Sequence, residues 1–241
     1  MQRLWARLIA ALYFVVAILP PGYAGTVTET NAELAKRLAR AITGSIPGDP
    51  GDRRVRKWFG PIRFSVIGIT PDDVRLAIDE DLRLLISATG LDVLVVDPAA
   101  ANFLVMASNN IVDDALGRYR SLTLSFLNSE ERARQILTAG DRERSCRADA
   151  RFVGFEITGI IIFVGSADSQ HSIGICMREK LPKALGLFRE DVHATDQRDA
   201  WAETEMLLLR VLYDTRLRPG MSEVEAKQIA RQIFSEIRPE L

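Results

Sequence analysis

A short helical segment after Cys176 carries the side chains best spaced for chemistry. They are Glu179 and Lys183, one helical turn apart, and Lys180 between them, and Gly186 ends the segment. A zinc site on successive helical turns uses neutral imidazoles, and an ammonium group is no ligand while it stays protonated. Glu179 and Lys183 instead have the spacing of an intrahelical ion pair, worth a few tenths of a kcal/mol. The segment therefore predicts neither a catalytic nor a metal-binding residue.

The two cysteines, Cys146 and Cys176, allow a disulfide, a metal pair or a reactive thiol. The histidines are His171 and His193, and neither forms a recognisable ligand or base motif with a cysteine. An oxidising compartment favours pairing of the two thiols. The closed loop of about 30 residues then stabilises the fold by about 3 kcal/mol in the chain-entropy model. A disulfide is the favoured interpretation.

The N-terminus indicates that the chain reaches such a compartment. Arg3 and Arg7 precede an apolar run, residues 8–19, and small residues at 22–24 fit a cleavage site. The run is shorter than the roughly 20 residues that a membrane-spanning helix needs. Residues 1–24 are therefore predicted to be a signal peptide, with an uncleaved anchor as the alternative. The mature protein is expected in the periplasm or outside the cell, without a stable membrane span.

The composition of the chain and the motifs that it lacks argue against several functions. The formal charge is −1, which does not favour nucleic acid as a partner. Phosphate-loop, dinucleotide and nucleophile-elbow motifs are absent. The basic cluster Arg53, Arg54, Arg56 and Lys57 fits contact with an acidic partner or anionic headgroups, but a solvated turn is favoured. The acidic side chains between Asp72 and Asp81, and the pair Asp113-Asp114, are interpreted as solvated helix faces.

Predicted strands and helices alternate along the rest of the chain. Thr70 and Pro71 predict a helix start, Gly90 its end, and Ser222 with Glu225 a capping box. Residues 108–149 give few signals beyond one helix. The predicted strands are 62–69, 91–96, 102–107 and 152–164, and the predicted helices are 31–42 with Asn31 as N-cap, 70–88, 128–140, 176–185, 201–213 and 222–237.

The order strand, helix, strand, strand, insertion, strand, helix is similar to zincin metallopeptidases, whose last strand precedes the helix with H-E-x-x-H. These helices often continue into Ala-Leu-Gly-Leu, found here at 184–187. The chain more closely resembles a bacterial family of exported proteins of unknown function. Its motifs are a Cys before E-E-x-x-Q-A-L-G-L, then L-Y-D-x-x-L-x-P-G-M, matched here by Cys176, 179–187 and 212–221. Lys180 replaces the second Glu and Lys183 the Gln.

The resemblance implies an α/β (α+β) fold, with a zincin-like mixed sheet, packed helices and a helical C-terminal part. Residues 25–57 are expected to form an N-terminal helix and linker, and residues 58–241 a single zincin-like domain. Glu179, Lys180, Lys183 and Gly186 belong to a helix that resembles a degenerate active site.

The favoured hypothesis is a non-catalytic exported or cell-envelope protein, a pseudo-peptidase scaffold that binds a peptide or an envelope protein without a cofactor. An extended peptide is expected to add as a strand beside residues 152–164. One alternative is a residual metal-dependent hydrolase that uses Glu179. Another is a structural envelope protein without a ligand.

Overall fold

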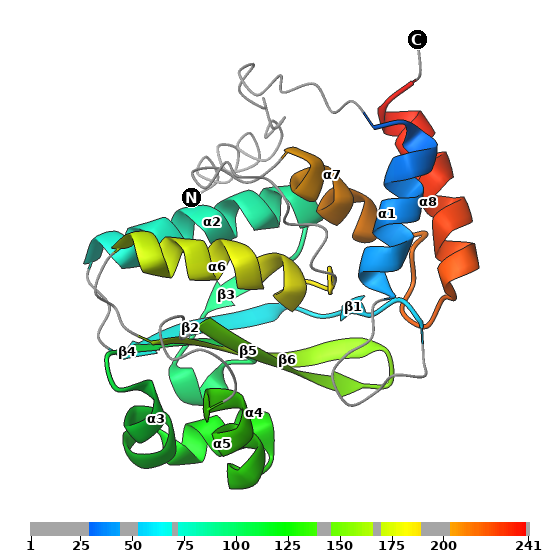
Figure 1. Cartoon of the computed structure of the whole chain (residues 1–241). Helices are drawn as coiled ribbons and strands as arrows, with labels where there is room; N and C mark the ends of the chain where they lie inside the picture. The colour runs from blue at the N-terminus through cyan, green and yellow to red at the C-terminus, as the bar shows by residue number, and fades with distance from the viewer. Residues whose placement is uncertain are drawn as a thin grey trace, which may run out of the picture.

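The chain folds around one mixed β-sheet (Figure 1). This computed structural model describes residues 29–43, 53–68, 72–138, 146–165, 170–188 and 203–239. Within these ranges β5 pairs antiparallel with β6, and the other pairings are parallel. The sheet order is β1-β6-β4-β2-β3, with β5 also beside β6. The strands are β1 Lys57–Trp58, β2 Ile62–Gly68, β3 Val93–Val95, β4 Phe103–Ser108, β5 Cys146–Val153 and β6 Glu156–Gly165.

The centre of the sheet is β4, whose six residues are all buried. Parallel strands covered on both faces read as continuous apolar runs, as β4 and most of β6 do. The register places Phe103 beside Phe64 on β2 and beside Ile160 on β6. The rings of Phe64 and Phe103 meet edge to face at 5.5 Å between centroids. This row of large side chains holds the middle of one face together.

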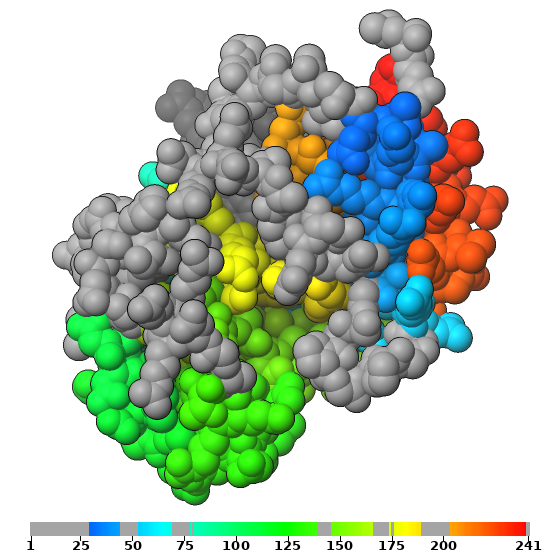
Figure 2. Space-filling view, viewed as in Figure 1, coloured from blue at the N-terminus to red at the C-terminus, as the bar shows by residue number. Residues whose placement is uncertain are grey.

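Five helices contribute to the apolar cluster on that face, with α2 and α6 over the strands and α1 and α8 together at one end of the molecule (Figure 1). Their apolar side chains pack against Phe64, Val105 and Ile162 and form the larger of two buried clusters in the described residues. Helices α2 and α6 contact each other, and α1 packs along α8. Figure 2 shows α1 in blue beside α8 in red and orange at one end of the molecule. The helices are α1 Asn31–Ile42, α2 Asp72–Thr89, α6 Gln170–Ala184, α7 Glu203–Leu212 and α8 Glu223–Ile237.

A second helical layer covers the opposite face, so that the sheet lies between two layers of helices (Figure 1). Leu104 and Met106 of β4 and Phe163 of β6 point to this side, because neighbouring residues of a strand face opposite ways. The layer consists of α3 Ile111–Asp113, the π-helix η2 Asp114–Arg118, α4 Arg120–Leu127 and α5 Glu130–Thr138, and a short 3₁₀ helix η1 spans Pro98–Ala100. The predicted α/β fold class is confirmed.

Local sequence explains where several helices begin and end. Ser222 and Glu225 form the predicted capping box at the start of α8. At α1 the prediction was wrong by one residue: Thr30 is the N-cap and Glu33 completes a capping box. Asn31 is instead buried, and its side-chain amide donates to the Arg238 carbonyl at 3.0 Å. Asn31 therefore binds the end of α8 instead of capping α1.

The main errors in the prediction lie between residues 108 and 165. The single strand expected over 152–164 instead contains the end of one strand, a turn and most of a second strand of a hairpin, because Gly154 adopts a left-handed φ of 59° between β5 and β6. The first strand of that hairpin, β5, was not predicted. Helices α3 and α4 were also missed, whereas α5 lies within the predicted helix 128–140.

Several sequence features fall outside the described residues. They include the signal peptide predicted at 1–24, the loop at 44–52, the helix cap at Thr70 and His193. Within the ranges that the structure describes, no helix is both long and apolar enough to cross a membrane.

Candidate functional site

The polar face of α6 carries the residues with the most suggestive spacing. The Lys183 ammonium lies 3.7 Å from the Glu179 carboxylate, so the predicted ion pair is present. Lys180 is closer to the same carboxylate, with Nζ 2.5 Å from Oε1. The Glu179 side chain is 45% exposed, and those of Lys180 and Lys183 are 16% and 22% exposed. Two ammonium groups therefore share one carboxylate where metal ligands would stand on a zinc-binding helix.

A disulfide joins Cys146 and Cys176, as the sequence predicted. It links the first residue of β5 to the middle of α6, with the two Cα atoms 5.5 Å apart. Both sulfur atoms are thereby unavailable as metal ligands or nucleophiles. Lys180 and Lys183 follow Cys176 by about one and two helical turns and project from the same side of α6. The disulfide thus fixes the side of α6 on which the two lysines lie as the side nearest β5.

Gly186 ends α6 in a Schellman arrangement. The Gly186 N–H donates to the Lys183 carbonyl, and the Leu187 N–H donates to the Pro182 carbonyl. Gly186 adopts φ 105°, and a β-carbon there would lie 2.5 Å from the Arg56 carbonyl oxygen. Glycine is therefore required both by the helix end and by the close approach of the chain before β1.

Two aromatic side chains hold the last carbonyls of this helix. The Trp58 indole N–H donates to the Ala184 carbonyl at 2.9 Å. The Tyr213 hydroxyl donates to the Leu185 carbonyl at 2.9 Å and accepts from the Trp58 backbone N–H at 3.3 Å. Burial raises the pKa of Tyr213, so it stays a protonated donor. The two sequence motifs of the resemblance, at 184–187 and 212–221, meet here, and their shared residues build a structural junction.

The rest of the second motif stabilises the same junction. Arg216 binds the carboxylates of Asp214 and Glu236, with four N···O distances of 2.8–2.9 Å. The guanidinium lowers the pKa of Asp214 and of Glu236. Leu217 is fully buried, and Gly220 turns the chain with φ 84°. These residues join the end of α7 to α8.

Two members of the basic cluster, Arg56 and Lys57, are buried rather than part of a solvated turn. Lys57 is 7% exposed, and its ammonium donates to the carbonyls of Leu212 at 3.0 Å and Asp214 at 3.3 Å. Burial lowers the pKa of Lys57 to about 8, although the charge of Asp214 opposes this change. Arg56 is 3% exposed and lies over the Phe152 ring at 5.8 Å. The preferred interpretation from the sequence was therefore wrong for Arg56 and Lys57.

The other two members of the basic cluster also have internal partners. Arg54 donates to the Gly220 carbonyl at 3.0 Å and lies over the Phe155 ring at 5.7 Å. Arg53 is 3.8 Å from the Glu223 carboxylate. The cluster fastens the chain before β1 to the hairpin turn and to the start of α8.

The predicted peptide site beside β6 is wrong. β5 pairs with β6 from Glu156 to Val164 along one side. β1 and β4 share the other side, at 156–157 and 160–165. No edge of β6 is left for an added strand. The outer edge of β5 is different, because no other described strand pairs with it.

The acidic side chains also have structural partners. Asp114 accepts a hydrogen bond from the buried Ser108 hydroxyl, and Asp113 accepts from the Asn110 amide at 2.5 Å. Asp81 is buried, so the interpretation of the acidic side chains between Asp72 and Asp81 as a solvated face was wrong for this residue. In the part of the chain that the structure describes, no three His, Cys, Asp or Glu side chains gather as a metal site would need. The side chain of His171 lies outside that part.

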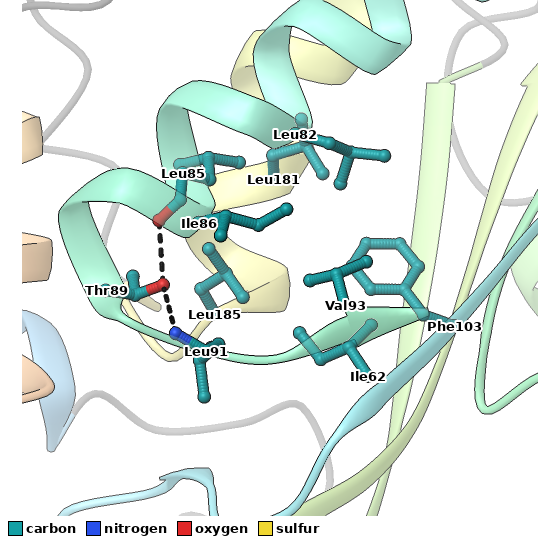
Figure 3. A pocket seen from close by; sticks show the side chains of 10 residues that line it. All are labelled: Ile62, Leu82, Leu85, Ile86, Thr89, Leu91, Val93, Phe103, Leu181 and Leu185. Carbon is teal, nitrogen blue, oxygen red and sulfur yellow. Dashed lines mark hydrogen bonds between the residues drawn. The ribbon is translucent and has the colours of Figure 1, made fainter. Parts of the chain in front are cut away.

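An apolar hollow lies between α2, α6 and the strands β2 to β4 (Figure 3). Its volume of ≈10 Å³ is at the lower limit for one water molecule. Thr89 closes one end by donating to the Leu85 carbonyl at 2.7 Å and accepting from the Leu91 N–H at 3.3 Å. The hollow is a packing gap, too small for a ligand.

Together these features define an α/β protein with helices on both faces of a mixed sheet, a disulfide from α6 to the edge strand β5, and a buried junction built from two motifs. The model of the family described as "Protein of unknown function (DUF2927)" matches residues 31–232. The chain therefore belongs to this family. No curated protein and no solved structure matches the chain. The resemblance to a family of unknown function is confirmed at that level.

Proposed function

We propose that this chain is a non-catalytic exported protein that binds an extended peptide or protein segment along the outer edge of β5. The β5 edge, defined here as the side of Cys146–Val153 with which no other described strand pairs, is the observation that carries the proposal. Alternate residues of an edge strand turn their backbone N–H and C=O groups outwards, and an added strand can pair with them. The eight residues of β5 give room for several such hydrogen bonds.

The opposite edge of the sheet is a weaker candidate. It is formed by β3, which has three residues, Val93–Val95, and exposes the apolar side chains of Leu94 and Val95. An added strand needs a ladder of several backbone hydrogen bonds, and three residues supply few of them. Length therefore favours β5.

The order of elements supports a zincin-like scaffold under this function. A strand, β2, is followed by α2, then by β3, β4, β5 and β6, and then by α6. Helices α2 and α6 lie side by side on one face, and the antiparallel strand β5 pairs with β6 on the side away from β4 (Figure 1). In zincins the helix after the last strand carries the metal ligands. Here the corresponding positions hold Glu179, Lys180 and Lys183.

The same positions support a function without catalysis. Metal-dependent hydrolysis needs a metal-activated water and a base. Glu179 is held between two ammonium groups, and both cysteine sulfurs are in the disulfide. The residues that most resemble a peptidase motif, at 184–187, serve as the packed end of a helix.

The disulfide also supports export to the periplasm or the cell exterior, since such bonds persist in oxidising compartments. The signal peptide predicted at 1–24 agrees with this localisation.

Hydrogen exchange on the purified disulfide-bonded protein tests strand addition. The probe is a ten-residue peptide with alternating valine and threonine, and its control is the same peptide methylated on alternate backbone nitrogens. Slower exchange of β5 amides with the first peptide, and not with the second, supports the proposal. The proposal is refuted if β5 amides exchange at the same rate with the first peptide, with the methylated peptide and without any peptide.

Metal analysis tests the absence of catalysis separately. The protein is expected to hold far less than one equivalent of zinc after dialysis against zinc and then buffer. Stoichiometric zinc that disappears in Glu179→Ala would establish a metal site and overturn the non-catalytic proposal. Glu131→Ala is a matched control, because this exposed carboxylate belongs to α5, on the opposite face of the sheet from α6.

A further inference from the structure

Basic side chains lie on both sides of the β5 edge, and they carry an inference that rests on the proposed function. We infer that the segment bound at this edge is acidic, with Glu or Asp at alternate positions facing the lysines of α6. The formal charge of the whole chain is −1, so a positive surplus at one place is a local feature and not a general property of the surface.

The two sides of β5 differ because side chains alternate along a strand. Cys146, Ala150 and Phe152 pack on the cluster that includes α6. Ala148 is two residues from both Cys146 and Ala150, so its side chain faces the same side, and it is exposed. Arg147, Asp149 and Arg151 occupy the alternate positions of the strand, so their side chains face the opposite side, towards α4 and α5. A peptide strand beside β5 alternates in the same way, so its side chains meet the two sides in turn.

On the α6 side, the charged groups that a bound peptide would meet are the ammonium groups of Lys180 and Lys183. They project from the side of the helix that the Cys176 disulfide turns towards β5. Ala148 and Ala150 are small, so β5 places no large side chain between its edge and the lysines. The Glu179 carboxylate that both lysines contact is 45% exposed, whereas the lysine side chains are 16% and 22% exposed, so water screens these ion pairs from the carboxylate side and limits their contribution to stability. A peptide carboxylate can therefore share these ammonium groups at small cost.

On the α4 and α5 side, the acidic residue of β5 is already neutralised. The Asp149 carboxylate receives two hydrogen bonds from Arg132 of α5, at 3.0 and 3.3 Å. Arg147 and Arg151 are the other charged residues of the strand, and Arg147 donates to the Cys146 carbonyl at 3.3 Å. Arg151 is exposed and donates to the Ser125 carbonyl at 3.0 Å, which holds its guanidinium near the surface beside β5. Both sides of the edge therefore favour anionic side chains.

The occupant to which we commit is an acidic extended segment of another protein. Complementary charge raises the association rate and discriminates against basic partners, and its effect falls with ionic strength. A second copy of this chain is a poorer fit, because an antiparallel pair of β5 edges would bring Arg147 and Arg151 of one copy beside those of the other.

Fluorescence anisotropy with three labelled decapeptides tests the inference. The peptides alternate valine with Glu, Gln or Lys and are blocked at both ends. The Glu peptide is expected to bind about tenfold more tightly than the Gln peptide at low salt, since two partly exposed charge pairs supply this difference. The advantage is expected to shrink as salt rises. Equal affinity of the Glu and Gln peptides, or tighter binding of the Lys peptide, would overturn the inference.

Charge reversal locates the preference on α6. The double variant Lys180→Glu with Lys183→Glu is expected to lose the preference for the Glu peptide and to bind the Lys peptide more tightly. Lys227→Glu with Arg231→Glu is the matched control, because both residues are exposed on α8. Circular dichroism and thermal unfolding of each variant confirm that it is folded. An unchanged preference in a folded α6 variant would overturn the role of the two lysines.

The outcomes separate this inference from the proposed function. If all three peptides protect β5 amides equally, strand addition stands and the acidic preference falls. If no peptide binds or protects β5, both fall. If β5 amides become protected as protein concentration rises without peptide, and size-exclusion chromatography shows a dimer, the edge binds a second copy and the inference is overturned.

Discussion

Replacing Gly186 by alanine tests whether the end of α6 is held by close approach of the chain before β1. Gly186 adopts φ 105°, a conformation that L-residues rarely occupy. A β-carbon at this position would lie 2.5 Å from the Arg56 carbonyl oxygen and 3.3 Å from a methyl carbon of Leu212. The carbonyl belongs to buried backbone, so the contact cannot be relieved by turning a side chain.

Two effects combine in the expected loss of stability. A left-handed conformation costs an alanine about 1–2 kcal/mol. Overpacking of a closely packed site costs about 1–3 kcal/mol. We therefore expect Gly186→Ala to lower the free energy of unfolding by about 2–5 kcal/mol.

Two other glycines separate these effects. Gly90 also has a positive φ, 67°, but nothing lies within 4 Å of its β-carbon position, so Gly90→Ala reports the conformational cost alone. Gly60 has neither a positive φ nor a neighbour within 4 Å, and Gly60→Ala is expected to change stability by less than about 0.5 kcal/mol. Gly60→Ala therefore serves as the baseline for the other two substitutions.

Urea unfolding followed by tryptophan fluorescence measures all three variants. Trp58 is buried and contacts the same helix end, so its emission reports this region. The order of destabilisation should be Gly186→Ala, then Gly90→Ala, then Gly60→Ala. A loss at Gly186 no larger than that at Gly90 would refute the reasoning, because the contact with Arg56 would then contribute nothing.

Three further predictions concern the disulfide, the aromatic cap and the buried lysine. Cys146→Ser with Cys176→Ser lowers the free energy of unfolding by about 3 kcal/mol in urea denaturation, because the bond links residues 30 apart. Tyr213→Phe removes the donor of the Leu185 carbonyl and costs about 1–3 kcal/mol in the same assay. Wild-type stability rises relative to Lys57→Met between about pH 8 and pH 10.5, since burial lowers the pKa of Lys57 to about 8 and the unfolded chain alone holds the proton there.

A separate outcome would contradict each of these three predictions. A double cysteine variant as stable as the wild type would show that the crosslink contributes nothing to stability. A loss below about 0.5 kcal/mol in Tyr213→Phe would show that water replaces the hydroxyl at the helix end. Parallel pH profiles for the wild type and Lys57→Met, from unfolding at several pH values, would show that Lys57 keeps an ordinary pKa in the folded protein.

Short-range features of the fold were predictable because neighbouring residues determine them. The capping box of Ser222 and Glu225 joins groups three residues apart, and the end of α2 at Gly90 depends on one φ angle. Strand β2 and helix α2 follow from apolar periodicity that the sheet then buries. With only two cysteines and a predicted signal peptide, the disulfide was also within reach.

The hairpin of β5 and β6 was not predictable in the same way. β5 carries Arg147, Asp149 and Arg151 among small residues, a pattern that is weak for a strand when its partner is unknown. The partner supplies the stability, through a ladder from Cys146 opposite Val164 to Val153 opposite Glu156. Without this pairing the sequence placed the peptide site on β6, a strand with no free edge.

The sequence by itself determined which side chains the polar positions of α6 carry, with Lys180 and Lys183 where the resemblance has Glu and Gln, and a protonated ammonium group is no metal ligand. Tertiary structure alone decided what the surrounding residues do. Lys57 reaches the Leu212 carbonyl across 155 residues, and Trp58 caps Ala184 across 126. Burial and hydrogen bonding at such separations depend on how layers pack, and a local pattern does not contain that information. For the same reason, only the folded chain reveals that β5 is an edge strand among the described strands and that it contacts α6.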